Sequence, residues 1–170
     1  MNKKGQAAME FLMTYGWAII VVLAAIGALA YFGVLSPSNL LPARTTFQAP
    51  VPNVDIAVIE ANGGAADAGT VTIAFRNNVG STITVTDIIN ASDDCGGIGT
   101  TKNIAVGTGA FGAIGGGVDV QNGDAFRLQL SCASGLVVGD RFASDIVFQY
   151  TNKDSGLSRP QKGTVEGEVV

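Results

Sequence analysis

The side chains best suited to catalysis are scarce in this sequence. The chain has no histidine, which removes the commonest general base and the commonest neutral metal ligand. Its two cysteines, Cys95 and Cys132, therefore have no imidazole to activate them, and their spacing is too wide for a CxxC redox or zinc motif. We expect a protein without enzyme activity, cofactor or bound metal.

Two explanations fit the cysteine pair. Cys95 and Cys132 would form a structural disulfide if this part of the chain lies outside the cell, where oxidising conditions preserve such bonds. Closing a loop of that length would stabilise the fold by about 4 kcal/mol. Alternatively, the two residues are separate buried thiols, since cysteine packs as a small apolar side chain.

Two polar motifs lie next to Cys95. Asp93-Asp94 could contribute carboxylate oxygens to a cation site, although a solvated acidic loop is the simpler interpretation. Asn90-Ala91-Ser92 is an N-x-S/T sequon, which makes Asn90 a candidate N-glycosylation site, although sequons also occur by chance. The glycine-rich segments 107–109 and 115–117 lack the GK[ST] of a phosphate-binding loop, so we predict turns there.

An uncharged N-terminal segment precedes all of these residues. Residues 11–43 contain no Asp, Glu, Lys or Arg, and only Thr14 is clearly polar between Phe11 and Leu35. About 20 apolar residues suffice to span a bilayer as a helix, and this run is too long for an ordinary cleaved signal. Lys3 and Lys4 precede the run, so the positive-inside rule places the N-terminus in the cytoplasm and the remainder outside.

Glu10 stands at the start of this apolar segment. A carboxylate at the edge of a membrane segment is costly unless it is paired, so Glu10 is a candidate assembly residue. The plainer interpretation is solvation at the membrane interface, helped by the positive end of the helix dipole. Small residues such as Ala24 and Ala28 would allow close contact between helices, whereas a lone membrane anchor would carry them incidentally.

The segment KKGQAAMEFL at positions 3–12, followed by MTYGWAI at 13–19, resembles the class III signal peptide of archaeal type IV pilins. The resemblance implies cleavage between Gly5 and Gln6 by a membrane prepilin peptidase, before the apolar helix, which therefore survives in the mature chain. It also implies that Glu10 pairs with the N-terminal amine of a neighbouring subunit or guides docking. An N-terminal Gln6 can cyclise and lose that charged amine.

The predicted organisation has four parts: a leader at 1–5, a hydrophobic helix at 6–35, a proline-rich joint at 36–53 and an extracellular β-rich head at 54–170. Period-2 patterns separated by Gly- and Asn-rich turns favour an antiparallel β-sandwich for the head. The expected strands are 54–60, 70–76, 82–89, 125–131, 146–151 and 164–170, with weaker ones near Ile104 and Val118. The expected fold class is α+β, a long N-terminal hydrophobic α-helix followed by a pilin-like head.

Together these patterns predict a pilin, the structural subunit of an archaeal type IV pilus-like filament that serves adhesion. We expect the precursor in the cell membrane and the mature chain in an extracellular filament. The expected partners are identical subunits, the prepilin peptidase, a pilus assembly ATPase and its membrane platform protein. A net charge of −4 without a stripe of Lys or Arg argues against nucleic acid binding. The alternatives are a membrane-tethered extracellular ligand-binding module or a minor pilin.

Overall fold

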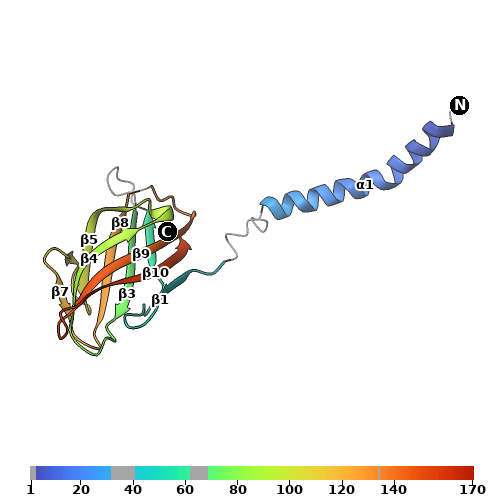
Figure 1. Cartoon of the computed structure of the whole chain (residues 1–170). Helices are drawn as coiled ribbons and strands as arrows, with labels where there is room; N and C mark the ends of the chain where they lie inside the picture. The colour runs from blue at the N-terminus through green and yellow to red at the C-terminus, as the bar shows by residue number, and fades with distance from the viewer. Residues whose placement is uncertain (1–2, 32–40, 62–68, 134) are drawn as a thin grey trace. The chain divides into compact units, whose positions relative to one another are not determined.

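The chain folds into an N-terminal helix and a β-rich head, which separate between Leu41 and Pro42 (Figure 1). The structure, a computed structural model, describes residues 3–31, 41–61, 69–133 and 135–170. The sequence of each unit favours the secondary structure that the unit forms. The first is rich in alanine and leucine and has no proline before residue 37, whereas the second alternates apolar with polar residues.

Helix α1 runs from Lys3 to Tyr31. The Thr14 hydroxyl donates a hydrogen bond of 2.8 Å to the backbone carbonyl of Glu10, one turn earlier, which satisfies this polar group within the helix. The helix begins before the expected Gln6, and its expected end near Leu35 lies outside the described residues.

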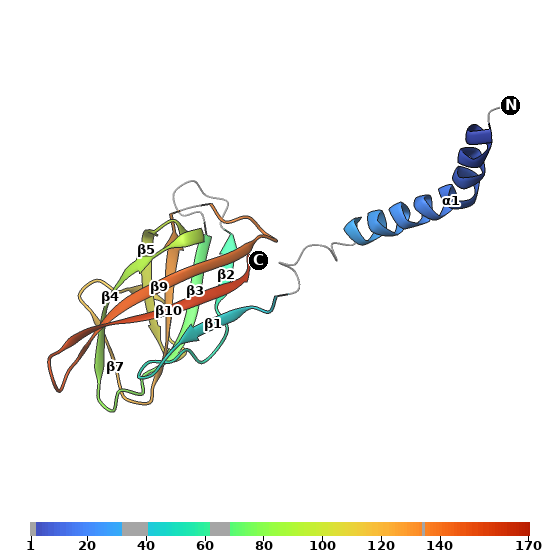
Figure 2. The same cartoon turned by 45° about the vertical axis from the view of Figure 1, so that its right-hand side comes forward.

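The head contains two antiparallel sheets of five strands each. Sheet A has the order β1-β10-β9-β4-β7, and sheet B has the order β2-β3-β8-β5-β6 (Figures 1 and 2). The strands are Arg44–Phe47 (β1), Val58–Ala61 (β2), Gly69–Arg76 (β3), Ile83–Ala91 (β4), Ile98–Val106 (β5), Gly112–Ala113 (β6), Val118–Val120 (β7), Ala125–Cys132 (β8), Arg141–Asn152 (β9) and Ser158–Glu168 (β10). The predicted α+β class, an apolar helix followed by antiparallel sheets, is confirmed.

One hydrophobic core lies between the two sheets. Buried and half-buried side chains alternate along β9, as expected for a strand with one face in a core. Phe75 of β3 contacts Phe47, Phe126 and Phe148, with ring centroids 4.8, 5.4 and 4.9 Å apart. Phe47 and Phe148 belong to sheet A, whereas Phe75 and Phe126 belong to sheet B. This aromatic cluster therefore packs the sheets together.

The head begins earlier than the sequence predicts. Strand β1 lies inside the segment 36–53 that the pattern assigns to a joint, and it pairs with β10. The Phe47 N–H donates to Asn53 Oδ1 at 2.9 Å, and Val51 is fully buried. The surrounding prolines obscure this strand in the sequence pattern, but an edge strand such as β1 tolerates them nearby.

Several strand bounds also differ from the prediction. β2 starts at Val58 rather than at residue 54, because the N–H groups of Ile56 and Ala57 donate to side-chain oxygens of Asp55 and Thr45. The weak pattern near Ile104 corresponds to a full strand, β5, and β9 and β10 both start earlier than expected. The segments 107–109 and 115–117 contain turns as predicted, with Gly109 and Gly117 donating to carbonyls three residues before them.

Residues after β10 connect the two sheets at one end of the head. The Val170 N–H donates to the Ile59 carbonyl at 2.9 Å, and the Ala61 N–H donates to the Val170 carbonyl at 3.1 Å. Val169 accepts a hydrogen bond of 2.8 Å from the Gly139 N–H. This segment therefore leaves sheet A and covers the outer edge of β2, which would otherwise present unpaired backbone groups.

Candidate functional site

Helix α1 exposes apolar side chains around its whole circumference. Its described large apolar side chains are between 45% exposed, at Leu29, and 87% exposed, at Tyr31. The stretch Met13–Tyr31 is long and apolar enough to cross a membrane, and its 19 residues measure about 28 Å, close to the roughly 30 Å of a bilayer core. Such a surface is stable in lipid or against other apolar surfaces.

Glu10 is the only carboxylate among the first 54 residues. Its side chain is exposed, and no ion pair joins it to the side chains that the structure describes. A carboxylate in apolar surroundings gains much from a cationic partner, because burial without one disfavours its charged form. The position therefore suits a contact with a cation from another chain.

A hollow on α1 has the residue spacing of a helix-packing site. It is lined by Tyr15, Ala18, Ile19, Val22 and Leu23. The spacing i, i+3, i+4, i+7 of the first four residues is that of a hole that receives a side chain of a facing helix. Ala18 is the smallest member, so it leaves room between its larger neighbours. The arrangement is entirely apolar and has no group that could perform catalysis.

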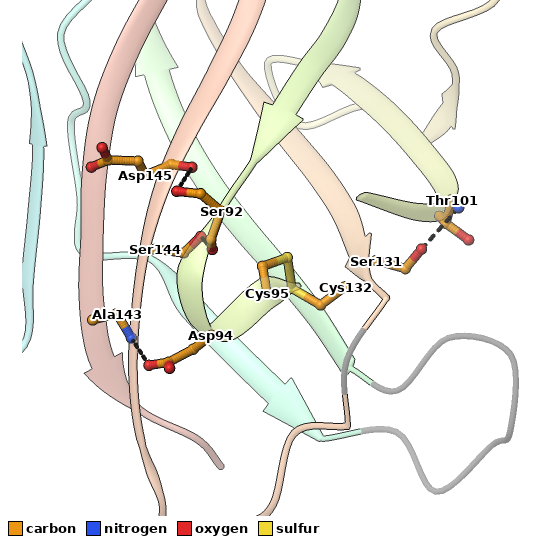
Figure 3. The surroundings of a disulfide bond; sticks show 9 residues. All are labelled: Ser92, Asp94, Cys95, Thr101, Ser131, Cys132, Ala143, Ser144 and Asp145. Atoms are coloured by element: carbon orange, nitrogen blue, oxygen red, sulfur yellow. Dashed lines mark hydrogen bonds between the residues drawn. A yellow bond between two sulfur atoms is a disulfide. The ribbon is translucent and has the colours of Figure 1, made fainter. Parts of the chain in front are cut away.

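The cysteines form a disulfide, Cys95–Cys132, and both side chains are fully buried (Figure 3). Cys95 ends the short helix η2 (Asp93–Cys95), which follows β4 of sheet A, and Cys132 ends β8 of sheet B. Of the two explanations that the sequence allows, the structure therefore shows the disulfide. The bond fastens the β4–β5 connection to sheet B.

The acidic loop beside the disulfide is engaged in backbone contacts. Asp94 Oδ2 accepts a hydrogen bond of 2.7 Å from the Ala143 N–H of β9, and the Ser144 hydroxyl donates to the Ser92 carbonyl (Figure 3). Within the described residues, no group of three or more His, Cys, Asp or Glu side chains is placed to hold a metal ion. Asp93 and Asp94 are thus not joined by a third such ligand, and Asp94 instead anchors η2 to β9.

The two predicted processing sites lie in different units. Gly5 and Gln6 belong to the start of α1, where the side chains of residues 3–8 lie outside the described part, so cleavage between them stays a prediction. Asn90 is exposed and is the penultimate residue of β4, where it pairs with Val147. The sequon therefore starts within a strand end, and its glycosylation also stays a prediction.

The outer surface of sheet A carries ion pairs that link separate segments of the chain. Lys162 of β10 binds Asp145 of β9 at 2.8 Å, and this hydrogen bond lowers the pKa of Asp145 and raises that of Lys162. Lys153 likewise binds Asp119 and, with a hydrogen bond from Thr84, lowers the pKa of Asp119. The side chains in these pairs are at least one-third exposed, which limits their effect on stability.

No protein family and no curated protein matches this chain, so comparison with known proteins does not assign its function.

The structure also reveals two features that the residue pattern did not single out. One is a hairpin between β9 and β10 that extends beyond the core, and the other is a hollow beside the disulfide. The run Leu136-Val137-Val138 between two glycines is the sequence signal for the second feature.

Proposed function

We propose that this chain is the precursor of a pilin, the structural subunit of an archaeal type IV pilus-like surface filament that serves adhesion. The observation that carries the proposal is the exposed apolar surface around α1, joined to a separately folded β-sandwich. A helix of this kind can lie in the membrane before assembly and then among copies of itself. The head remains outside as the surface of the filament.

Assembly uses two features of α1. The apolar hole at Tyr15, Ala18, Ile19 and Val22 receives a side chain from a neighbouring helix. After cleavage between Gly5 and Gln6, the Glu10 carboxylate pairs with the N-terminal amine of an adjacent subunit. Repetition of such a contact between different surfaces does not close on itself, so it generates a helical filament.

The proposed route begins with the precursor in the cell membrane, its N-terminus in the cytoplasm and its head outside. A membrane prepilin peptidase removes residues 1–5, and a pilus assembly ATPase with its platform protein moves the mature subunit into the filament. An extracellular head agrees with the buried Cys95–Cys132 bond, because disulfides persist in oxidising surroundings.

Electron microscopy of cells with and without this chain tests the proposal. We expect thin surface filaments in the producing cells, loss of those filaments when the chain is deleted, and antibody labelling along their length. A Gly5 variant that blocks cleavage should leave the precursor in the membrane and produce no filament. Undiminished filaments after deletion contradict the proposal, and labelling confined to filament tips identifies a minor pilin instead. Cells in which the chain stays as single membrane-tethered copies favour the ligand-binding module.

A further inference from the structure

The connection between β9 and β10 projects beyond the core with both faces bare. Every residue from 153 to 160 is exposed, whereas Tyr150, earlier in β9, is buried. Hydrogen bonds nevertheless fix the backbone: Asn152 Oδ1 accepts the N–H groups of Asp154 and Ser155 at 2.9 and 3.1 Å. We name residues 153–159 the hairpin tip. Because its shape is already set, little conformational entropy is lost when it binds.

The hairpin tip combines an apolar side chain with an unpaired cation. Leu157 is 55% exposed, although its backbone carbonyl accepts a hydrogen bond of 3.0 Å from the Asn152 N–H. Among the described residues, the Arg159 guanidinium has no ion-pair partner, while the Lys153 ammonium is bound to Asp119. A matching surface would offer an apolar contact and a carboxylate side by side.

The hollow beside the disulfide offers both of these groups. It measures about 370 Å³, and its lining includes the carboxylates of Asp93, Asp94 and Asp140 and the apolar side chains of Leu136 and Val137. Val137 is 60% exposed. The Asp140 carboxylate has no hydrogen-bond or ion-pair partner among the described residues, so it can accept a new cation.

The charge of this hollow is opposite to that of Arg159. Its three carboxylates outnumber one lining cation, Arg141, whose guanidinium also binds Glu166 at 3.3 Å. Nearby Lys162 is likewise bound to Asp145. The lining therefore carries more negative than positive side chains, although Lys162 also interacts electrostatically with Asp93, and the excess negative charge is complementary to an incoming guanidinium.

The hairpin tip and the hollow lie at opposite ends of the same strand. β9 starts at Arg141, which lines the hollow, and ends at Asn152, which fixes the tip. Its 12 residues separate the two features by about 40 Å. Both views of the head place the β9–β10 connection away from the loop that precedes β9 (Figures 1 and 2). One copy therefore cannot fill its own hollow, whereas a copy displaced along β9 can.

We propose that the hairpin tip of one copy of this chain docks into the disulfide-side hollow of the next copy. Leu157 contacts Leu136 and Val137, and Arg159 pairs with Asp140. The two surfaces differ, so the contact repeats without closing and links heads in a row. This inference rests on the proposed filament function and specifies how neighbouring heads meet.

One hairpin buries too little surface for a stable complex by itself, since specific interfaces usually bury more than about 1,000 Å². The contact should form where the α1 helices already hold the subunits together and so raise the effective concentration of the heads. The test therefore uses filaments of the full chain.

Cysteine cross-linking in isolated filaments tests the contact. We expect the double variant Val137→Cys with Leu157→Cys to give a ladder of covalent oligomers on mild oxidation, because each copy would link to two neighbours. Thr72→Cys with Leu157→Cys is the matched control, since Thr72 lies on β3, away from the hollow, and should give no ladder. Filaments of the first variant without a ladder, or equal ladders from both variants, overturn the inference.

Charge reversal provides a second, independent measurement on the cross-linkable variant. Arg159→Glu or Asp140→Lys alone should lower the yield of covalent oligomers severalfold, and the two together should restore it, because the pair is then reversed. Equal yields from the single and combined reversals contradict the pairing. If cells with the unsubstituted chain make no filament, the proposed function fails and the contact fails with it. Filaments that form without tip-to-hollow links refute the contact alone.

Discussion

Cys95 and Cys132 form a fully buried disulfide between the β4–β5 connection and the end of β8, where the Ala133 N–H also donates a hydrogen bond of 3.0 Å to the Cys95 carbonyl. Cys95 is the last residue of η2, which follows β4 of sheet A, whereas Cys132 is the last residue of β8 in sheet B. The bond joins two residues that are 37 positions apart in the sequence. It therefore restricts the unfolded chain over a long loop while it fastens the β4–β5 connection in the folded one.

Removal of this bond should destabilise the head strongly. We expect Cys95→Ala with Cys132→Ala to lower the free energy of unfolding by about 4 kcal/mol, because the unfolded chain regains loop entropy. Urea denaturation of the full chain in detergent, followed by the fluorescence or circular dichroism of the head, measures this loss. A reductant added under native conditions should leave the wild-type bond intact, since both sulfurs are buried. A loss below about 1 kcal/mol contradicts this account.

The Asp94 carboxylate should stabilise the fold by accepting the hydrogen bond from the Ala143 N–H. Replacing Asp94 by Ala removes the carboxylate acceptor at 2.7 Å and should cost about 1 kcal/mol, because the contact is exposed and water replaces part of it. Asp154→Ala is the matched control, since its carboxylate lies in the exposed hairpin turn. Equal denaturation midpoints for the two variants count against the proposed anchoring of η2 to β9.

Acid should weaken the ion pairs of sheet A. Hydrogen bonds from Lys162 and Thr164 lower the pKa of Asp145, so this carboxylate stabilises the fold above the pKa of the unfolded state, near 3.8. The contribution is lost as the pH falls through the lower pKa of the folded state. We therefore expect Asp145→Asn to lower the thermal midpoint at pH 7, with a difference that shrinks toward pH 2. A difference that grows on acidification contradicts the sign.

Glu10 should act in assembly rather than in membrane insertion. Glu10→Gln removes the charge that would pair with an amine, at little cost to the apolar helix, so we expect about a tenfold loss of filaments with normal membrane levels of subunit. Glu10→Asp retains the charge and should assemble better than Glu10→Gln. Filament counts and membrane immunoblots measure the two outcomes. Normal filament numbers from Glu10→Gln would remove Glu10 from the assembly mechanism.

We expect Asn90 to carry a glycan, because its sequon begins at an exposed residue. Its side chain points to solvent at the end of β4, so a glycan can be accommodated without changing the core. We expect the intact mass of the filament subunit to exceed the mass of the mature polypeptide, and Asn90→Gln to remove the excess. An unmodified wild-type mass ends this prediction.

The sequence predicted elements best where a strand has one buried face throughout. In Gly69–Arg76 the residues Val71, Ile73 and Phe75 are buried and alternate with polar or small ones, so the expected strand 70–76 nearly matches β3. The apolar N-terminal run predicted the helix equally well, because the sequence contains no proline before residue 37. In such segments, the local pattern and the tertiary environment agree.

The remaining features depend on contacts between distant segments. β1 forms because Arg44–Phe47 pairs with β10. A segment of four residues among prolines is too short to show a period-2 pattern in the sequence. The isolated sequence favours a disulfide but also allows a pair of buried thiols, and the packing of η2 beside β8 decides between them. The hairpin tip escapes a pattern analysis because its residues are exposed on both faces.

High-resolution electron microscopy of filaments from cells that produce this chain tests the central claim most directly. The account predicts a core built from copies of α1, each beginning at Gln6, with Trp17 and the other apolar side chains shielded by neighbouring helices and the β-sandwich heads outside. It is contradicted if the mature chain is found only as single detergent-soluble copies, or if the filaments contain the head without its apolar helix.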